Sequence, residues 1–350
     1  MHIPDNAPVI IGTGQKTWHS TDVSRTPLDA LCAAATAAID DAGHSGITSA
    51  IDTVAMIRFI ADTTPGTGAL FPRNPGRQLS HRLGITDAKI FQGTIGGNTP
   101  QYLVNHFAEK LARGEHDVVL LAGAELLATL FSALRSGGDI SAWSGETEAQ
   151  PTTVGQEREG HNAIEMAHGL YEPINTYPLF ENSLRHHLST SQKHHTAHIA
   201  EICSRMSRVA AGNPHAWKQQ FQSAEEISTV VQKNRYIGYP YTRAMNPILE
   251  VDMAAAVIMT TAGKARQMGV DPSTWIYLRG GTDVNDIWYV SERPNLHSSP
   301  AIKAAWESVS ARAGIALDEI SSFDIYSCFP SAVEVACNEI GLSPLDNRGV

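Results

Sequence analysis

The sequence predicts an α/β fold in which a sheet of buried strands lies between helices. Two apolar runs, residues 7–12 (APVIIG) and residues 117–125 (DVVLLAGAE), are typical of strands covered on both faces. A helix is expected directly after the first run, over residues 26–42, because Thr26 suits an N-cap and Pro27 the first turn. This alternation of buried strands and helices favours a layered α/β protein.

Further elements are expected along the chain in the same pattern. The stretch at residues 90–113 predicts a strand, a glycine-containing corner and a helix that begins at Pro100. A second unit of this kind is expected near the end of the sequence, where Cys328 and Pro330 precede a helix. The other expected elements are strands near 51–60, 251–265, 275–278 and 322–325, and helices at 300–314 and 331–340.

Changes in composition divide the sequence into three segments. Residues 1–125 together with 240–268 carry the buried-strand pattern, and residues 269–350 repeat it in an incomplete form. Residues 126–239 are polar and rich in His, Gly and Pro, with amphipathic pieces such as residues 196–211. We expect this middle segment to be an inserted cap over the core.

Composition narrows the functional classes. The 350 residues include 36 acidic and 26 basic side chains, for a net charge of -10, which argues against nucleic acid as a partner. The four cysteines form no CxxC pair, so reduced thiols are expected rather than disulfides. The N-terminus lacks the features of a signal peptide, and no apolar run is long enough for a membrane helix. These features predict a cytoplasmic protein without a membrane partner.

One glycine pattern partly matches a nucleotide-binding site, and one histidine pair has the spacing of metal ligands. Gly12 and Gly14 follow an apolar strand, but Thr17 stands where a dinucleotide fingerprint has its third glycine. His194 and His198 would share one helical face, as metal ligands can, but there is no HExxH motif and no nearby carboxylate is indicated. The sequence therefore predicts neither a nucleotide cofactor nor a bound metal.

Other candidate side chains have two readings each. His161 and His168, seven residues apart, either line a pocket in the cap or serve packing and surface polarity. Cys328 precedes a predicted helix, where a thiol can become a nucleophile or a metal ligand. Its alternative is the common one for a free cysteine, a small buried apolar side chain.

Four stretches, in the right order, resemble the thiolase superfamily, whose members cleave or form carbon–carbon bonds on acyl-CoA thioesters. They are residues 7–17 (APVIIGTGQKT), 96–125 (GGNTPQYLVNHFAEKLARGEHDVVLLAGAE), 246–269 (NPILEVDMAAAVIMTTAGKARQMG) and 321–342 (SSFDIYSCFPSAVEVACNEIGL). Residues 94–101 and 169–181 further resemble bacterial thiolase-like proteins labelled acetyl-CoA acetyltransferase. The resemblance implies a five-layered α-β-α-β-α fold of two similar halves, with a loop domain inserted in the first half. It also implies a coenzyme A thioester as substrate, no tightly bound cofactor, and a homodimer as a possible assembly.

The family's site residues carry over only in part. The resemblance places Gly97 where thiolases have their nucleophilic cysteine, and glycine cannot form an acyl-enzyme. Tyr326 stands where the family has Asn or His, while Cys328 and Phe329 match the family's Cys-Phe. Asp252 matches the Asp of the family's Asp-Gly-Ala-Ala. The family's Gly-His-Pro and Cys-Gly-Gly motifs normally lie beyond Val350, so the second half is expected to be truncated.

Three functions remain open from the sequence. The first is an acyltransferase or carbon–carbon lyase in which amides around Asn98 and Thr99 stabilise an oxyanion and Tyr326 acts as acid or base, its alternative being a core aromatic. The second is a non-catalytic CoA-binding or partner protein that kept the fold. The third, the least favoured, is an acyl-enzyme thiolase that uses Cys328.

Overall fold

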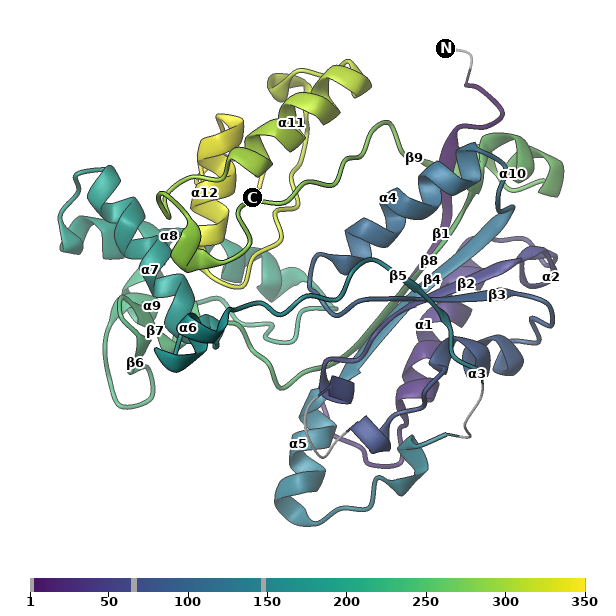
Figure 1. The fold of residues 1–350 in the computed structure, drawn as a ribbon, viewed down its shortest axis with the longest axis horizontal. Coiled ribbons are helices and arrows are strands. Elements are labelled where there is room, and N and C mark those ends of the chain that lie inside the picture. The colour runs from purple at the N-terminus through teal and green to yellow at the C-terminus, as the bar shows by residue number, and fades with distance from the viewer. Residues whose placement is uncertain (1–2, 64–67, 146–148, 350) are drawn as a thin grey trace. The chain divides into compact units, whose positions relative to one another are not determined.

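A computed structural model describes residues 3–63, 68–145 and 149–349. Met1 and Val350, which bound the outer predicted segments, lie outside the described residues. The described chain forms two compact units (Figure 1). Unit 1 is Met1–Glu157 with Leu249–Arg279, and unit 2 is Arg158–Ile248 with Gly280–Val350. The three sequence segments remain a prediction. Part of the expected cap, up to Glu157, groups with the first segment, and the rest groups with the end of the chain.

Unit 1 is built on a seven-stranded sheet with the order β5-β3-β2-β4-β8-β1-β9. The strands β5, β3, β2 and β4 pair in parallel, whereas β8, β1 and β9 join by antiparallel pairs. The expected parallel sheet is therefore found on one side only, and the sheet as a whole is mixed. The strands are β1 (Pro8–Thr17), β2 (Thr53–Ile57), β3 (Lys89–Gly93), β4 (Val118–Leu126), β5 (Thr152–Val154), β8 (Asp252–Thr261) and β9 (Ile276–Tyr277).

Helices cover both faces of this sheet (Figure 1). One face packs against α1 and α3 through small and aliphatic side chains such as Ala34 and Leu79. The other face packs against α4 through Leu103, Phe107 and Leu111, which are fully or almost fully buried. This layering confirms the predicted α/β class. The helices of unit 1 are α1 (Pro27–Asp41), α2 (Ile47–Ala50), α3 (Pro75–Arg82), α4 (Thr99–Ala112), α5 (Leu127–Ser136) and α10 (Ala262–Met268).

The starts of the predicted helices agree closely with the structure, because local capping signals determine them. Thr26 caps α1 through a reciprocal capping box with Asp29, and Pro27 is the first helical residue, as predicted. Helix α4 begins at Thr99, one residue before the predicted start. The predicted strands near 7–12, 51–60 and 117–125 are β1, β2 and β4, and the strand predicted over 251–265 is β8, which ends at Thr261 where α10 follows.

The two glycines of the Gly12-Thr13-Gly14 pattern have a packing role. A Cβ atom at Gly12 would lie 2.2 Å from the carbonyl oxygen of Ala38, and one at Gly14 would lie 2.1 Å from that of Ala34. Strand β1 and helix α1 therefore touch backbone to backbone, which only glycine permits. This close approach accounts for the pattern without a nucleotide.

Unit 2 is mainly helical and has its own core. Its elements are α6 (Ala163–Ala167), α7 (Pro173–His187), α8 (Gln192–Gly212), α9 (Ala224–Ser228), β6 (Tyr236–Gly238), β7 (Tyr241–Thr242), α11 (Pro300–Ala313) and α12 (Pro330–Ile340). Ile199 and Phe329 centre one apolar cluster, and Ile202 and Val333 centre another. The predicted helices at 300–314 and 331–340 are thus confirmed as α11 and α12, and the amphipathic piece at 196–211 lies in α8.

The predicted strand at 322–325 is wrong. The segment is irregular, and Phe323 and Ile325 instead pack against the apolar cluster around α8 and α12. A strand requires a partner strand, and in the described part of unit 2 the only sheet is the two-stranded pair β6-β7. A second large sheet is accordingly not found among the described residues, and a truncated second half is not confirmed.

No helix within the described ranges is both long and apolar enough to cross a membrane.

Candidate functional site

The corner between β3 and α4 is shaped by glycine. A Cβ atom at Gly93 would lie 2.7 Å from Thr99 Cγ2 and 3.1 Å from Leu103 Cδ1. A Cβ atom at Gly96 would lie 2.9 Å from Thr99 Oγ1 and 3.0 Å from Asn98 Oδ1. The chain can therefore turn tightly against the start of α4 only because these positions lack side chains.

Gly97 and Asn98 form the exposed tip of this corner. Asn98 is the N-cap residue of α4, but its side chain makes no capping hydrogen bond. The expected amide donors are reduced by two features: the Thr99 N–H already donates to the Gly96 carbonyl over 3.1 Å, and Pro100 has no N–H. At the start of the helix, Asn98 is therefore a better placed donor to an anion than Thr99.

Tyr326 and Cys328 are brought together in unit 2. The Tyr326 hydroxyl lies 3.4 Å from Cys328 Sγ, and either atom can be the donor. Partial burial, followed by the hydrogen bond to Cys328, raises the pKa of the Tyr326 phenol. The side chain is nevertheless 59% exposed, so a substrate can reach it. At neutral pH this phenol keeps its proton, which favours Tyr326 as a proton donor over a base.

The residue after this pair anchors the loop. Phe329 is buried and stacks on Tyr177 at 4.5 Å between ring centroids, with Tyr241 on another side at 5.3 Å. Cys328 is partly buried against the same cluster. This intermediate burial decides neither for a reactive thiol nor for a small apolar packing residue. Tyr326 and Cys328 are held in unit 2, whereas Gly97 and Asn98 belong to unit 1.

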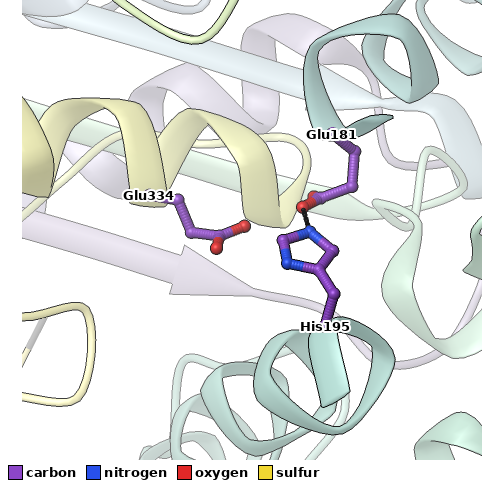
Figure 2. A group of neighbouring side chains, drawn as sticks. All are labelled: Glu181, His195 and Glu334. Carbon is purple, nitrogen blue, oxygen red and sulfur yellow. Dashed lines mark hydrogen bonds and ion pairs between the residues drawn. The ribbon is translucent and has the colours of Figure 1, made fainter. Parts of the chain in front are cut away.

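A buried polar cluster in unit 2 was missed by the sequence analysis. Glu181 from α7, His195 from α8 and Glu334 from α12 converge on one another (Figure 2). Their relative exposures are 0%, 2% and 2%, and each offers a ligand atom within 4.8 Å of the others. Among the described residues, they form the one group of His, Cys, Asp and Glu with the spacing of a metal site.

Hydrogen bonds order this cluster. His195 Nε2 and Glu181 Oε1 lie 2.5 Å apart. The Tyr241 hydroxyl contacts both Glu181 Oε2 at 2.7 Å and Ser331 Oγ at 2.9 Å. One carboxyl oxygen of Glu334, Oε2, is buried without a hydrogen-bond partner in the described structure.

The histidines noted in the sequence have different surroundings. His194 is exposed, and it is the neighbouring His195 that points into the cluster. His198 Nε2 lies 3.5 Å from Glu334 Oε1, and burial followed by the charge of His195 lowers its pKa. His161 lies near the Tyr171 ring, and His168 contacts the Ile164 carbonyl oxygen of its own helix.

A sequence signal for the cluster did exist. Glu181 lies between Pro178 and Leu184 on the buried face of α7, and Glu334 stands inside the apolar run SAVEVA. A carboxylate in a buried apolar stripe requires a partner.

A hollow lies in unit 1, at the end of α4 away from the corner. Its volume is about 640 Å³, and its lining includes Lys264 and Arg266. Lys264 Nζ lies 2.9 Å from Asp117 Oδ2, and Arg266 pairs with Asp5. These cations are neutralised by carboxylates of the chain itself, so the hollow carries no evident anion site.

The chain was compared with family models, curated proteins and solved structures, and only solved structures match it. No family model and no curated protein matches the chain. It is similar over its full length to a solved structure, the monomeric SCP2-thiolase-like protein type 1 from Mycobacterium smegmatis, with 31% identity and a TM-score of 0.81. The chain spans 66% of the length of that relative.

Two more distant structures share the fold alone. The Ltp2-ChsH2(DUF35) aldolase is 19% identical with a TM-score of 0.66, over 97% of this chain and 78% of the other. The acetyl-CoA acetyltransferase from Syntrophomonas wolfei is 16% identical with a TM-score of 0.62, over 99% and 86% of the two chains. These matches show what the motifs in the sequence indicated: the chain is thiolase-like, and it resembles the thiolase superfamily across its whole described length.

Proposed function

We propose that the chain acts on acyl-CoA thioesters, as an acyltransferase or a carbon–carbon lyase, without a cysteine nucleophile at the β3–α4 corner. The observation that carries this proposal is the contact of 3.4 Å between the Tyr326 hydroxyl and Cys328 Sγ, directly before α12. In a thiolase-like fold, a proton donor at this place can act on a substrate even though Gly97 offers no thiol.

The lyase reaction is the form that these groups favour. When a 3-hydroxyacyl thioester is cleaved, the electron pair of the broken carbon–carbon bond forms an enolate on the thioester. The substrate hydroxyl gives its proton to water as the bond breaks, the neutral Tyr326 phenol then donates its proton to the enolate, and a proton from water restores the phenol. Asn98, at the β3–α4 corner of unit 1, is proposed separately as an amide donor to an oxyanion, on the basis of its exposed position there. The name of one distant structure, an aldolase, agrees with this choice.

Two variants test the chemistry. Tyr326→Phe is expected to lower the turnover of 3-hydroxyacyl-CoA substrates by about 10²- to 10⁴-fold, the usual contribution of a positioned acid or base. Tyr171→Phe is the matched control, because this phenol is also exposed in unit 2, at 53%. Turnover by Tyr326→Phe equal to that of the control would remove the acid role.

Intact mass measured after mixing with acetyl-CoA separates the alternatives. We expect no acetyl adduct on the chain. An adduct that disappears in Cys328→Ala would instead establish an acyl-enzyme on that thiol.

A second candidate function, non-catalytic CoA binding, is favoured by the glycine at position 97. It predicts measurable CoA affinity with no turnover of 3-hydroxyacyl-CoA or 3-ketoacyl-CoA substrates by the unaltered chain. A homodimer remains a prediction from the resemblance, to be measured by light scattering.

A further inference from the structure

We propose that Glu181, His195 and Glu334 form a binding site for one divalent transition-metal ion, with Zn²⁺ as the best-matched ion. The three side chains come from three different helices of unit 2 and point toward a common space (Figure 2). This site is separate from the chemistry proposed for Tyr326 and does not depend on it.

The charges in the cluster call for a cation. Two carboxylates and one imidazole are all at most 2% exposed, and burying charge without compensation is very costly. A divalent ion bound among the three side chains would neutralise both carboxylates.

The unpartnered oxygen of Glu334 supplies an independent reason. Oε2 is buried and accepts no hydrogen bond in the described structure, although Oε1 lies beside His198. Buried polar atoms are rarely left without a partner, so an orphaned oxygen at the edge of a His–Glu pair indicates a missing ligand. A metal ion in the cluster would be that partner.

The donor set selects the type of ion. One imidazole nitrogen and two carboxylate oxygens suit Zn²⁺, which binds such atoms at about 2.0–2.2 Å and often uses three protein ligands with one open position. Mg²⁺ and Ca²⁺ prefer a shell made entirely of oxygen, with several waters, which a closed site containing an imidazole does not offer. The Tyr241 hydroxyl fixes the second oxygen of Glu181, as outer hydrogen bonds commonly do for metal ligands.

Two rival explanations define the controls. The cluster could hold only protons, with Glu334 as a neutral acid. Zinc could also bind at the surface, where His187 and His297 stack with ring centroids 4.0 Å apart. The test must distinguish the buried cluster from both.

The experiment titrates Zn²⁺ into the full chain after removal of metal with EDTA, with isothermal calorimetry and thermal unfolding as readouts. We expect one Zn²⁺ per chain and a rise of several degrees in Tm. Mg²⁺ at the same concentration should leave Tm unchanged. Failure of Zn²⁺ to bind, or an equal shift by Mg²⁺, would overturn the proposal.

The variants assign the ligands. Glu334→Gln keeps the size and shape of the side chain, so it should fold, yet it removes a carboxylate ligand and should weaken Zn²⁺ binding by about 100-fold or more. His195→Gln should do the same and keeps the test valid if Glu334→Gln is poorly folded. His297→Ala, the matched control, should bind Zn²⁺ as the unaltered chain does. Binding that survives Glu334→Gln and His195→Gln but is lost in His297→Ala would place the ion at the surface.

Discussion

Substitution of Asp252 is expected to destabilise unit 1 more than substitution of any of its other carboxylates. Its side chain is 0% exposed and accepts hydrogen bonds from the Thr129 amide at 3.1 Å and from the Thr129 hydroxyl at 2.6 Å. Arg25 Nη1 lies 3.7 Å from Asp252 Oδ2. The Thr129 hydroxyl in turn accepts from the amide of Asp22, so one carboxylate orders β8, α5 and the loop before α1. Asp252, noted in the sequence as part of a family motif, thus has a structural role here.

The loss of stability in Asp252→Ala can be worked out from the hydrogen-bond donors that lose their acceptor. Thr129 is 0% exposed, so its amide and hydroxyl would both lose their acceptor in a buried place, at about 1–3 kcal/mol each. Arg25 would also lose a partner, although Asp22 remains 3.7 Å away. We expect a total loss of about 3–5 kcal/mol. Asp252→Asn keeps one acceptor oxygen and should cost about half as much.

Hydrogen exchange measured by mass spectrometry is the suitable assay, because it reports on β4 and β8 separately from unit 2. Glu250→Gln is the matched control. Glu250 is two residues away, and its two hydrogen bonds to Arg135, at 3.0 Å and 2.8 Å, are exposed. Exposed pairs of this kind contribute little to stability. If Asp252→Ala changes the stability of β4 and β8 no more than Glu250→Gln does, the reasoning from buried hydrogen bonds is refuted.

Two further predictions concern packing and thiol chemistry. Gly14→Ala should destabilise unit 1 by about 3 kcal/mol or more in the same exchange assay, because its Cβ would lie 2.1 Å from the Ala34 carbonyl oxygen. Gln15→Ala, on the exposed side of β1, should change little, and equal effects would contradict backbone contact with α1. Burial, followed by nearby carboxylates, raises the pKa of Cys203 and of Cys337 to about 12, so both thiols stay protonated at pH 8. Their alkylation in the folded chain should be at least about 100-fold slower than in the unfolded chain and should accelerate with rising pH, and labelling at the unfolded rate would contradict this.

Much of unit 1 could be predicted because its signals are local. The run DVVLLAGAE is buried by its own composition, and Thr26 with Asp29 caps α1 within a few residues. Strand β5 was not predicted, because Thr152–Val154 is short, lies in a polar segment and becomes a strand only by pairing with β3 at the sheet edge. The same dependence on partners explains why residues 322–325, apolar enough for a strand, are irregular.

The candidate sites differ in the same way, because one is local in the sequence and the other is formed by packing of distant helices. Tyr326 and Cys328 are two residues apart, so their contact was within reach of sequence reasoning. Glu181, His195 and Glu334 meet only because α7, α8 and α12 pack together, and no spacing in the sequence encodes that meeting. His194 and His198 indicated the right helix, but His194 is exposed, His198 contacts Glu334 without being one of the three, and His195 was not singled out. The apolar neighbours of Glu334 would have been the better signal.

The buried cluster and the proposed reacting residues are joined by a continuous set of contacts. Tyr241 holds Glu181 through its hydroxyl and packs its ring on Phe329, the residue that follows Cys328. The same hydroxyl contacts Ser331 in the first turn of α12. Whatever neutralises Glu181 and Glu334 therefore also fixes the start of α12 and the loop that carries Tyr326. A metal bound in this cluster would hold that loop in place through the contacts of Tyr241 with Glu181 and Phe329.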